Sequence, residues 1–406
     1  MRIIKKGFLY LKKEGIFPAI KKTFEKCLRK ARQFPFRIIG CVTAPDRIKD
    51  LQVSVKDKTV FLLVPGIDWN IPLFQRPHQI AVELSKREDV FVFFLPDQYK
   101  YDLLSFDKKV NDRLYLLSLF MVKHIDKILS GCREVVIMMT WTRHIDILSK
   151  IRHDILIYDY VDEINLFYYY DKQMEYGHRF LMQNANFTLA TSDRLYAKAK
   201  DCAKKALLCE NAGDYAFFSN IAGCETNPLI ADTVIKYDAV IGYYGCLAYW
   251  FDYETVLLAA ERQTNWLFVL VGHDFDGTGA CLLKSKLSNI LYIQAQPYKE
   301  LPSFLKAFDI AIVPFLINEI TNAVSPVKIF EYMAAGKPVL SSDMPECRKY
   351  ASVYRYHNVD DFIDMARLLI DKRGDAEYTA LLNKEAKENT WESRVNAIIA
   401  ATRNEI

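Results

Sequence analysis

Short apolar runs that alternate with helix-like segments constrain the fold of this chain more than any other feature. Each run is rich in Val, Ile and Phe and is bounded by turn residues. Such runs are typical of strands buried on both faces of a parallel sheet. The first series comprises TVFLLVPG (59–66), VFVFFLPD (90–97), EVVIMMTW (134–141), ILIYDYVD (155–162), FTLATSD (187–193) and ALLCENAG (206–213).

A second series of apolar runs follows a break in this pattern. Residues 215–237 contain Gly223, Asn227 and Pro228 and no clear strand, so we place an inter-domain linker there. The sequence therefore predicts an α/β fold of two doubly wound Rossmann-like domains, with a cleft between facing strand ends where such sheets bind ligands. The second series comprises AVIGYYG (239–245), WLFVLVGHD (266–274), NILYIQ (289–294), DIAIVPF (309–315) and KPVLSSD (337–343).

Length and cysteine usage indicate a two-domain cytoplasmic protein. The 406 residues are too many for one core. No apolar run reaches the length of a transmembrane helix, and no secretory signal with an apolar centre is present. Nine cysteines without C-x-x-C spacing argue against a disulfide framework or a zinc site and for the reducing cytoplasm.

The net charge of +4 hides a strongly basic N-terminal arm. Residues 1–37 carry twelve Lys and Arg against Glu14 and Glu25, about +10, so the remainder is about −6. Interspersed apolar residues predict two short amphipathic helices broken around Gly15–Pro18. Such an arm suits an anionic membrane surface at the inner face of the cytoplasmic membrane, or it packs as a solvated helix on a domain flank. Nucleic acid is disfavoured because the rest of the chain is acidic.

The stretch SPVKIFEYMAAGKPVLSSD (325–343) predicts a short helix before a buried strand. Ser325 has the character of an N-cap, followed by a proline at the first helical position. Gly336 is expected to be the C-cap, and the Lys-Pro pair after it cannot continue the helix.

Lys328 would then lie in the first turn of that helix, at the positive end of its dipole. A cation is unfavourable there unless an anion shares the site, and the exposed backbone N–H groups offer a seat for one. Glu331 lies one turn further on, where a carboxylate can accept hydrogen bonds from sugar hydroxyls. The alternative is a Lys328–Glu331 surface pair at i, i+3.

A glycine-containing turn opens the second domain. Gly242 and Gly245 flank two tyrosines at the end of the first strand, and a helix is expected to start near Asp252. The glycines would let the backbone approach a phosphate without an intervening Cβ. The pattern is neither G-x-G-x-x-G nor a P-loop, and a plain β–α turn explains it equally well.

Polar side chains also follow the first strand of the first domain. A helix is expected to begin near Pro77, which gathers Gln75, Arg76 and His78 at a strand end. Arg76 can hold a phosphate or an acceptor oxygen, and His78 can accept a proton. A histidine at a helix start is also commonly structural.

Three carboxylates follow another strand of this domain, in DYVDE (159–163). Asp159, Asp162 and Glu163 could supply a base, hold acceptor hydroxyls or ligate a metal, but no second acidic cluster has suitable spacing. At least one of them also fits an N-cap of the next helix.

Taken together, these blocks resemble GT-B glycosyltransferases of glycosyltransferase family 4, near the enzymes of teichuronic acid and capsule biosynthesis. The resemblance runs from about residue 59 to residue 395, and the SPVK…GKPV block is its most specific part. The other matching pieces are the opening from Trp69 to Gln79, YDYVDE, ENAGDYAFF (210–218), IGYYGCLAYWFDYE, PYKELPSFLKAFDIAIVPF and NTWESRV (389–395).

The resemblance implies a glycosyltransferase that uses a nucleoside diphosphate sugar (UDP-, dTDP- or GDP-sugar) and a glycan or lipid-linked acceptor. It implies transfer with retention, no further cofactor and no metal at the diphosphate. Glu331 would hold the ribose, Gly245 would lie against the diphosphate and Lys328 would neutralise it. Ser325 would belong to the same site.

The resemblance also assigns residues near the donor sugar and the base. The loop from Phe315 to Val324 would approach the sugar, with Asn318 and Glu319 as polar candidates. Tyr298 would lie beside the base.

The resemblance also implies how the chain divides into domains. The expected boundaries are a basic arm (1–37), an acceptor-side domain (38–222), a donor-binding domain (238–388) and a helix that crosses back to the first domain (389–406).

Two departures from the family pattern keep other functions open. The family has a glutamate eight positions before Glu331, where this chain has Ala323. The Arg and Lys that usually follow the glycine-rich turn are also missing, which leaves diphosphate charge to Lys328, backbone amides and Arg76. The alternatives are a GT-B nucleotide-sugar epimerase and a catalytically inactive GT-B module that binds a partner in a polysaccharide assembly complex.

Overall fold

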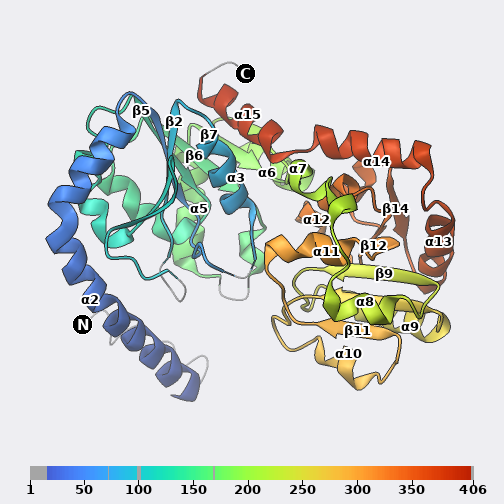
Figure 1. Cartoon of the computed structure of the whole chain (residues 1–406). Coiled ribbons are helices and arrows are strands. Elements are labelled where there is room, and N and C mark those ends of the chain that lie inside the picture. Colours follow the sequence, from blue (N-terminus) through green and yellow to red (C-terminus); the bar gives the residue numbers. More distant parts are fainter. Residues whose placement is uncertain (1–15, 72, 98–101, 168–169, 404–406) are drawn as a thin grey trace. The chain divides into compact units, whose positions relative to one another are not determined.

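A computed structural model describes residues 16–71, 73–97, 102–167 and 170–403 (Figure 1). Its strands form two sheets. The eight-stranded sheet has the order β3-β4-β2-β1-β5-β6-β7-β8, and the six-stranded sheet has the order β11-β10-β9-β12-β13-β14. Pairs such as β1 with β2 and β9 with β10 are parallel, while β3 and β4 are antiparallel. This is the α/β architecture that the alternating runs predict.

The chain divides into two compact units, residues 1–71 with 84–156 and residues 72–83 with 157–406. The elements of the first unit are α2 (Ile16–Val55), β1 (Thr59–Val64), β2 (Val90–Phe94), β3 (Asp107–Asn111), β4 (Leu114–Leu117), η1 (Leu119–His124), α4 (Ile125–Ile128), β5 (Glu134–Met139) and η2 (Thr142–Lys150). Two elements include the unit boundaries, α3 (Arg76–Ser85) and β6 (Ile155–Tyr160).

The second unit holds the rest of the described elements. Its strands are β7 (Phe187–Ala190), β8 (Ala206–Leu208), β9 (Ala239–Tyr244), β10 (Trp266–Val271), β11 (Ile290–Ile293), β12 (Ile310–Val313), β13 (Val339–Ser342) and β14 (Val353–Tyr356). Its α-helices are α5 (Lys172–Asn184), α6 (Asp193–Cys202), α7 (Tyr215–Phe218), α8 (Pro228–Val234), α9 (Tyr253–Arg262), α10 (Ala280–Lys284), α11 (Leu301–Leu305), α12 (Val327–Ala334), α13 (Val359–Asp371), α14 (Ala376–Glu388) and α15 (Trp391–Thr402).

Every apolar run singled out in the sequence contains a strand, so both series are confirmed. The strands end earlier than the runs because the last residues of each run belong to the turn. No strand occurs in the described linker residues 215–237, which form α7 and α8 with a short 3-10 helix between them. Asp252 caps α9, where its Oδ1 accepts the N–H of Thr255 at 3.1 Å, as the predicted helix start requires.

The N-terminal helix differs from the prediction. A single helix, α2, runs from Ile16 to Val55, so no break occurs after its start and the expected boundary between residues 37 and 38 falls inside it. Pro18 lies in the first turn, where a missing N–H costs little. Pro35 and Pro45 lie inside the helix and are exposed, so water can reach the carbonyls that they leave unpaired. The first of the two predicted helices lies outside the described residues.

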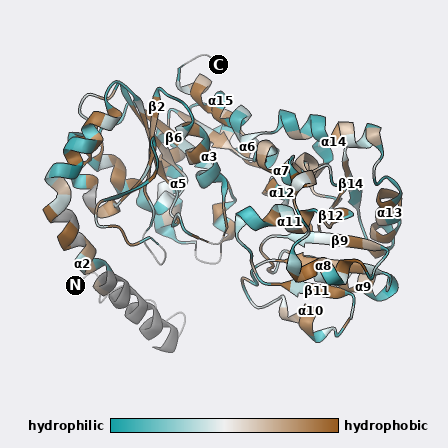
Figure 2. Cartoon of the chain, in the orientation of Figure 1, coloured by the Kyte–Doolittle hydropathy of each residue, from teal (hydrophilic) through white to brown (hydrophobic). Residues whose placement is uncertain are grey.

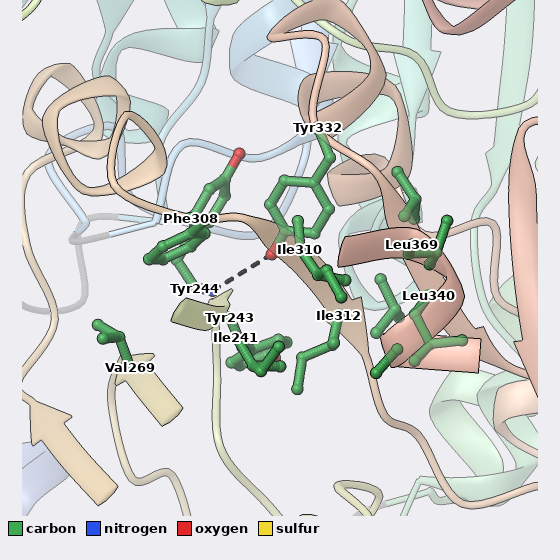
Figure 3. Packing of buried hydrophobic residues seen from close by; sticks show 14 of the residues in the cluster. Ile241, Tyr243, Tyr244, Val269, Phe308, Ile310, Ile312, Tyr332, Leu340 and Leu369 are labelled. Atoms are coloured by element: carbon green, nitrogen blue, oxygen red, sulfur yellow. Dashed lines mark hydrogen bonds between the residues drawn. The ribbon is translucent and has the colours of Figure 1, made fainter. Parts of the chain in front are cut away.

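The core of the six-stranded sheet is built from its apolar strands and the helices against them (Figure 3). Gly242 lies within β9, and a Cβ there would approach the ring of Phe308 to 2.1 Å. Its lack of a side chain therefore serves packing in the core, and the expectation that Gly242 approaches a phosphate is wrong. The hydroxyl of Tyr332 accepts the backbone N–H of Tyr244 at 3.2 Å, which ties α12 to the end of β9.

Among the residues that the structure describes, no helix combines the length and the apolarity needed to span a bilayer.

Candidate donor-binding site

The start of α12 lacks a side-chain cap. The N-cap residue is Pro326, and the predicted N-cap Ser325 lies one position earlier. The Ser325 hydroxyl instead accepts the backbone N–H of Asn211 at 3.3 Å, and its carbonyl accepts the Asn211 side-chain amide at 2.7 Å. The prediction of Ser325 as a cap is therefore wrong because Asn211, distant in sequence, takes its hydroxyl. The N–H of Ile329 donates to the carbonyl of Pro326 at 3.3 Å, which leaves the N–H groups of Val327 and Lys328 at the start of α12 as candidates to receive an anion.

The other end of α12 agrees with the prediction. Gly336 has a φ of +65°, and its N–H donates to the carbonyl of Met333 at 2.9 Å. The N–H of Lys337 donates to the carbonyl of Tyr332 at 3.0 Å. This pair of bonds is a Schellman motif, which ends the helix at its glycine.

Lys328 lies in the first turn of α12 with its ammonium against two aromatic rings. Its Nζ is 5.5 Å from the centre of the Tyr243 ring and 5.7 Å from that of Phe315. The side chain is half-buried, and within the described part of the chain no carboxylate lies within 4.0 Å of the ammonium. Burial lowers the pKa of Lys328, and nearby Glu331 opposes this shift. The alternative of a Lys328–Glu331 surface pair is therefore wrong.

Gly245 makes room for the Lys328 side chain. A Cβ at this position would lie 2.1 Å from Lys328 Cε and 2.7 Å from its Nζ. The φ of Gly245 is +145°, a conformation that residues with side chains rarely adopt. The backbone is held there by a bond from the Gly245 N–H to the carbonyl of Val271 at 2.8 Å. The glycine therefore brings backbone and ammonium together at one point.

Glu331 is buried behind Lys328, only 3% exposed, and accepts two tyrosine hydroxyls. The hydroxyl of Tyr244 donates to Oε2 at 2.7 Å and that of Tyr298 donates to Oε1 at 3.0 Å. Burial raises the pKa of Glu331 to about 7, although both hydroxyls act to lower it. Each carboxylate oxygen keeps a further acceptor position, so Glu331 can still bind a ligand hydroxyl.

Replacing Glu331 by glutamine is expected to flatten the dependence of stability on pH. The folded-state pKa of about 7 exceeds the ordinary value of 4.5, so the folded chain holds a proton that the unfolded chain releases. The free energy of unfolding should therefore fall as pH rises from about 4.5 to about 7. Melting temperatures across this range should show a smaller fall in the variant.

The control for this experiment is Asp162→Asn, which removes a separate carboxyl of similar behaviour. The wild-type slope should be reduced by each variant and more by both together. An unchanged slope in Glu331→Gln would contradict the raised pKa of Glu331.

Tyr298 links Glu331 to Gln79 of α3 through its hydroxyl. Its hydroxyl accepts the side-chain amide of Gln79 at 3.1 Å while donating to Glu331. Its ring stacks on Phe217 with a centroid separation of 5.4 Å. Tyr298 is half-buried beside Glu331, so the structure brings these two predicted residues together.

Asn318 and Glu319, the two residues predicted to contact the donor sugar, lie in the loop after β12, and Asn318 stabilises a turn of that loop. The side-chain oxygen of Asn318 accepts the N–H groups of Ile320 at 2.9 Å and Thr321 at 3.1 Å. This closes a turn in which Asn318 is structural. Glu319 is exposed in the same loop. Ala323, in the position of the missing family glutamate, is buried.

Arg76 and Asp159 form a buried ion pair, 6% and 0% exposed. The Arg76 Nε donates to Asp159 Oδ1 at 3.0 Å, Nη1 donates to the carbonyl of Glu210 at 3.1 Å, and Nη2 donates to Cys209 Sγ at 3.4 Å. Burial acts to lower the pKa of Arg76, but the negative charge and hydrogen bond of Asp159, together with Cys209, have the larger combined effect, so the pKa of Arg76 is raised. All guanidinium nitrogens are engaged, so the predicted acceptor and phosphate roles of both residues are wrong.

His78 is fully buried, and its Nδ1 accepts the backbone N–H of Gln75 at 3.1 Å. A side chain at the third helical position that bonds back to the N-cap is a capping-box arrangement. His78 therefore stabilises the start of α3, and its prediction as a proton acceptor is replaced by this structural role. Gln75 itself is exposed.

Asp162 and Glu163 are adjacent in sequence but differ in burial and in ion pairing. Glu163 is buried and pairs with Lys198 of α6, whose Nζ lies 2.6 Å from Oε1, so its predicted acceptor role is replaced by an ion pair. Asp162 is half-buried. Burial, followed by the charges of Asp159 and Glu163, raises the pKa of Asp162 to about 7. Of the three carboxylates, Asp162 is suited to accept or release a proton near neutral pH.

Sequence reasoning gave no role to three residues that shape this site. They are Asn211, which holds the chain before α12, and Tyr243 and Tyr244, which contact Lys328 and Glu331. Phe315, the first residue of the loop expected to approach the donor sugar, has its ring against the Lys328 ammonium. The two tyrosines between Gly242 and Gly245 were a visible signal, because a buried tyrosine hydroxyl needs a hydrogen-bond partner. In the described residues, no group of three or more His, Cys, Asp or Glu side chains is arranged to hold a metal ion.

Comparison with known proteins finds a family match in the C-terminal part of the chain. Residues 230–401 match the family described as glycosyl transferases group 1. TuaH of Bacillus subtilis, which carries the name of a teichuronic acid biosynthesis glycosyltransferase, is 26% identical over 232 residues. That match spans 55% of this chain and 58% of TuaH.

Solved structures match over most of the chain. HepE of Anabaena, solved in complex with UDP, has a TM-score of 0.60 at 13% identity and covers 86% of this chain and all of its own. The trehalose-6-phosphate protein of E. coli, bound to UDP-2-fluoro glucose, has a TM-score of 0.62 at 11% identity and covers 85% of this chain and 98% of its own. The chain thus has the GT-B fold, and its residues 230–401 match the glycosyl transferases group 1 family.

Proposed function

We propose that this chain is a glycosyltransferase that moves a sugar from a nucleoside diphosphate sugar to a cell-surface polysaccharide or lipid-linked glycan precursor. The observation that carries the proposal is the Lys328 ammonium, half-buried in the first turn of α12. No carboxylate of the described residues lies within ion-pair distance of it. A cation at the positive end of a helix is unfavourable unless an anion shares the site. The diphosphate of a donor supplies that anion.

The donor contacts follow from the site. Lys328 and the first-turn N–H groups of α12 hold the diphosphate, which passes Gly245 where no Cβ intervenes. Glu331 uses its remaining acceptor positions for the ribose hydroxyls, and Tyr298 lies beside the nucleoside. HepE was solved in complex with UDP, and the E. coli protein was solved with UDP-2-fluoro glucose bound. UDP-sugars are therefore the first donors to test, before dTDP- and GDP-sugars.

In the reaction, the bond between the anomeric carbon and the diphosphate oxygen breaks and a bond to an acceptor oxygen forms. Lys328 and the helix N–H groups stabilise the negative charge that develops on the departing diphosphate. The acceptor hydroxyl must lose its proton, and we assign Asp162 as the group that receives it, because this carboxyl follows the end of β6, is only half-buried and has a pKa that burial raises to about 7. Transfer with retention and a donor-binding domain at 238–388 complete the proposal.

Binding and turnover assays test this function. We expect the purified protein to bind UDP and a UDP-sugar in isothermal titration and to release UDP faster when membranes carrying acceptor are added. Absence of binding to any nucleotide sugar at millimolar concentration would contradict the donor site. Binding with interconversion of the free donor would indicate an epimerase, and binding without any turnover would indicate an inactive binding module.

Gly245→Ala is expected to weaken UDP binding by roughly ten-fold or more, the cost of one charge-assisted contact of about 1.5–3 kcal/mol. The new Cβ would displace the Lys328 ammonium, which lies 2.7 Å from its position. The matched control is Gly277→Ala, since Gly277 also has a positive φ of +84° but open space around its Cβ. Equal UDP affinities in the two variants would rule out a specific role for Gly245.

Activity is expected to persist without a divalent metal at the diphosphate, because Lys328 and the start of α12 provide the positive charge. The measurement is turnover in EDTA compared with turnover in added Mg²⁺ or Mn²⁺. Complete loss in EDTA that either metal restores would contradict this part of the proposal.

We also propose that the protein works at the inner face of the cytoplasmic membrane, where a lipid-linked acceptor lies. Residues 1–37 carry about +10 and are attracted to anionic lipid. This attraction is electrostatic and is screened by salt.

A further inference from the structure

Helix α2 presents an apolar face that nothing in the described chain covers. Phe34, Ile38 and Val42 recur at intervals of four residues along this helix, which places them on one side of it. Figure 2 shows both hydrophobic and hydrophilic residues along the coloured part of α2. The exposed fractions are large for such side chains: Phe34 63%, Ile38 52%, Ile39 51% and Val42 76%. Pro35 and Pro45 are exposed as well. We call the residues Phe34, Ile38, Ile39 and Val42 the apolar face.

Other residues of the same helix fix its orientation on the first unit. Ala44, Leu51 and Val55 are buried. The Arg47 Nε donates to Asp107 Oδ1 at 2.8 Å, and the Gln52 side-chain amide donates to the carbonyl of Lys127 at 2.7 Å. The part of α2 from Ala44 to Val55 is therefore anchored on the first unit, and the apolar face precedes it along the helix.

A run of exposed large apolar side chains marks an interaction surface. The charge of the neighbouring sequence indicates the partner. Residues 1–37, which run into this face, carry twelve Lys and Arg against two Glu. A surface that combines apolar side chains with a strong positive charge complements an anionic lipid bilayer, where apolar groups enter the headgroup boundary and basic groups meet the phosphates.

We propose that the apolar face of α2 inserts into the surface of an anionic membrane and holds the enzyme there. The proposal builds on the membrane location given under Proposed function but changes its physical basis. Docking through the arm alone would be lost in high salt, since salt screens exposed charges. Insertion of Phe34, Ile38 and Val42 adds a hydrophobic contribution that salt does not screen. Membrane binding should therefore be reduced by salt but not abolished.

Val53 offers a matched control for substitutions in the apolar face. Val53 is 78% exposed on the same helix, close to the 76% of Val42, but Asp46, Lys49 and Asp50 lie between it and the apolar face. Val42→Asn and Val53→Asn thus make the same chemical change at equally exposed positions. Neither site is packed in the core, so both variants should fold.

The experiment is co-sedimentation of the full chain with vesicles of phosphatidylglycerol and phosphatidylcholine, and of phosphatidylcholine alone, at low and high salt. Val42→Asn and Ile38→Asn should each weaken binding to anionic vesicles about ten-fold at both salt concentrations, the value expected for one apolar side chain withdrawn from the lipid. Val53→Asn should bind like the wild type. UDP affinity should be the same in all variants.

Other results would overturn the inference. Equal losses in Val42→Asn and Val53→Asn, or no loss in either, would show that the apolar face does not enter lipid. A concentration-dependent dimer that Val42→Asn converts to monomer would show that a second copy of the chain covers the face. Since UDP binding is measured in parallel, failure of the membrane proposal is distinguishable from failure of the donor site.

Discussion

Arg76→Met is expected to lower the free energy of unfolding by about 3–5 kcal/mol. The substitution leaves the Asp159 carboxylate fully buried without its cation, and removing one partner of a buried ion pair is much more costly than removing both. The carbonyl of Glu210 loses its donor as well. Urea denaturation followed by tryptophan fluorescence measures the change.

Two variants make this prediction specific. Arg76→Met combined with Asp159→Leu should recover much of the loss, because both charges are then gone. Arg133→Met removes an exposed partner of Asp89, whose pair at 3.2 Å is worth at most about 1 kcal/mol. If Arg76→Met were no more destabilising than Arg133→Met, or if the double variant were worse than the single one, the ion pair would not stabilise the fold as described.

Most strands could be predicted because strands buried on both faces are continuously apolar in sequence. Strands such as β1 and β10 are covered on both faces, so every residue in them is buried and the run is continuously apolar. The strand β3 was missed because its residues DKKVN are mostly exposed at the edge of the sheet. The four-residue β14, VYRY, has one exposed and one half-buried side chain and no clear apolar signal. Alternating or polar edge strands carry too little information in one sequence.

The candidate site was predictable where it depends on local geometry. Lys328 follows from the helix start and Gly336 from the helix end, and both are set by residues within a few positions. Arg76 was misread because its partner Asp159 lies 83 residues away, and Ser325 because Asn211 lies 114 residues away. A polar side chain at a strand end can face a ligand or a distant segment of its own chain, and only the fold decides between them.

Lys328→Ala is expected to lower kcat/KM for the nucleotide sugar by about ten- to 150-fold, equivalent to about 1.5–3 kcal/mol of lost transition-state stabilisation. The folded state should lose little, because the half-buried ammonium makes no ion pair with any described carboxylate and sits there against the helix dipole. Steady-state kinetics and melting temperatures separate the two effects. Lys337→Ala is the control, since Lys337 is also a half-buried lysine whose pKa burial lowers, to about 8.

A double-mutant cycle with Gly245 tests whether the two residues act together. If Gly245→Ala harms donor binding by pushing the ammonium aside, it should cost much less in a Lys328→Ala background, where its Cβ no longer meets a side chain at 2.1 Å. Independent, additive losses would mean that the glycine acts on the donor through its backbone alone. Wild-type kcat/KM in Lys328→Ala would remove the observation on which the donor site rests, because the ammonium at the start of α12 would then have no anion to bind.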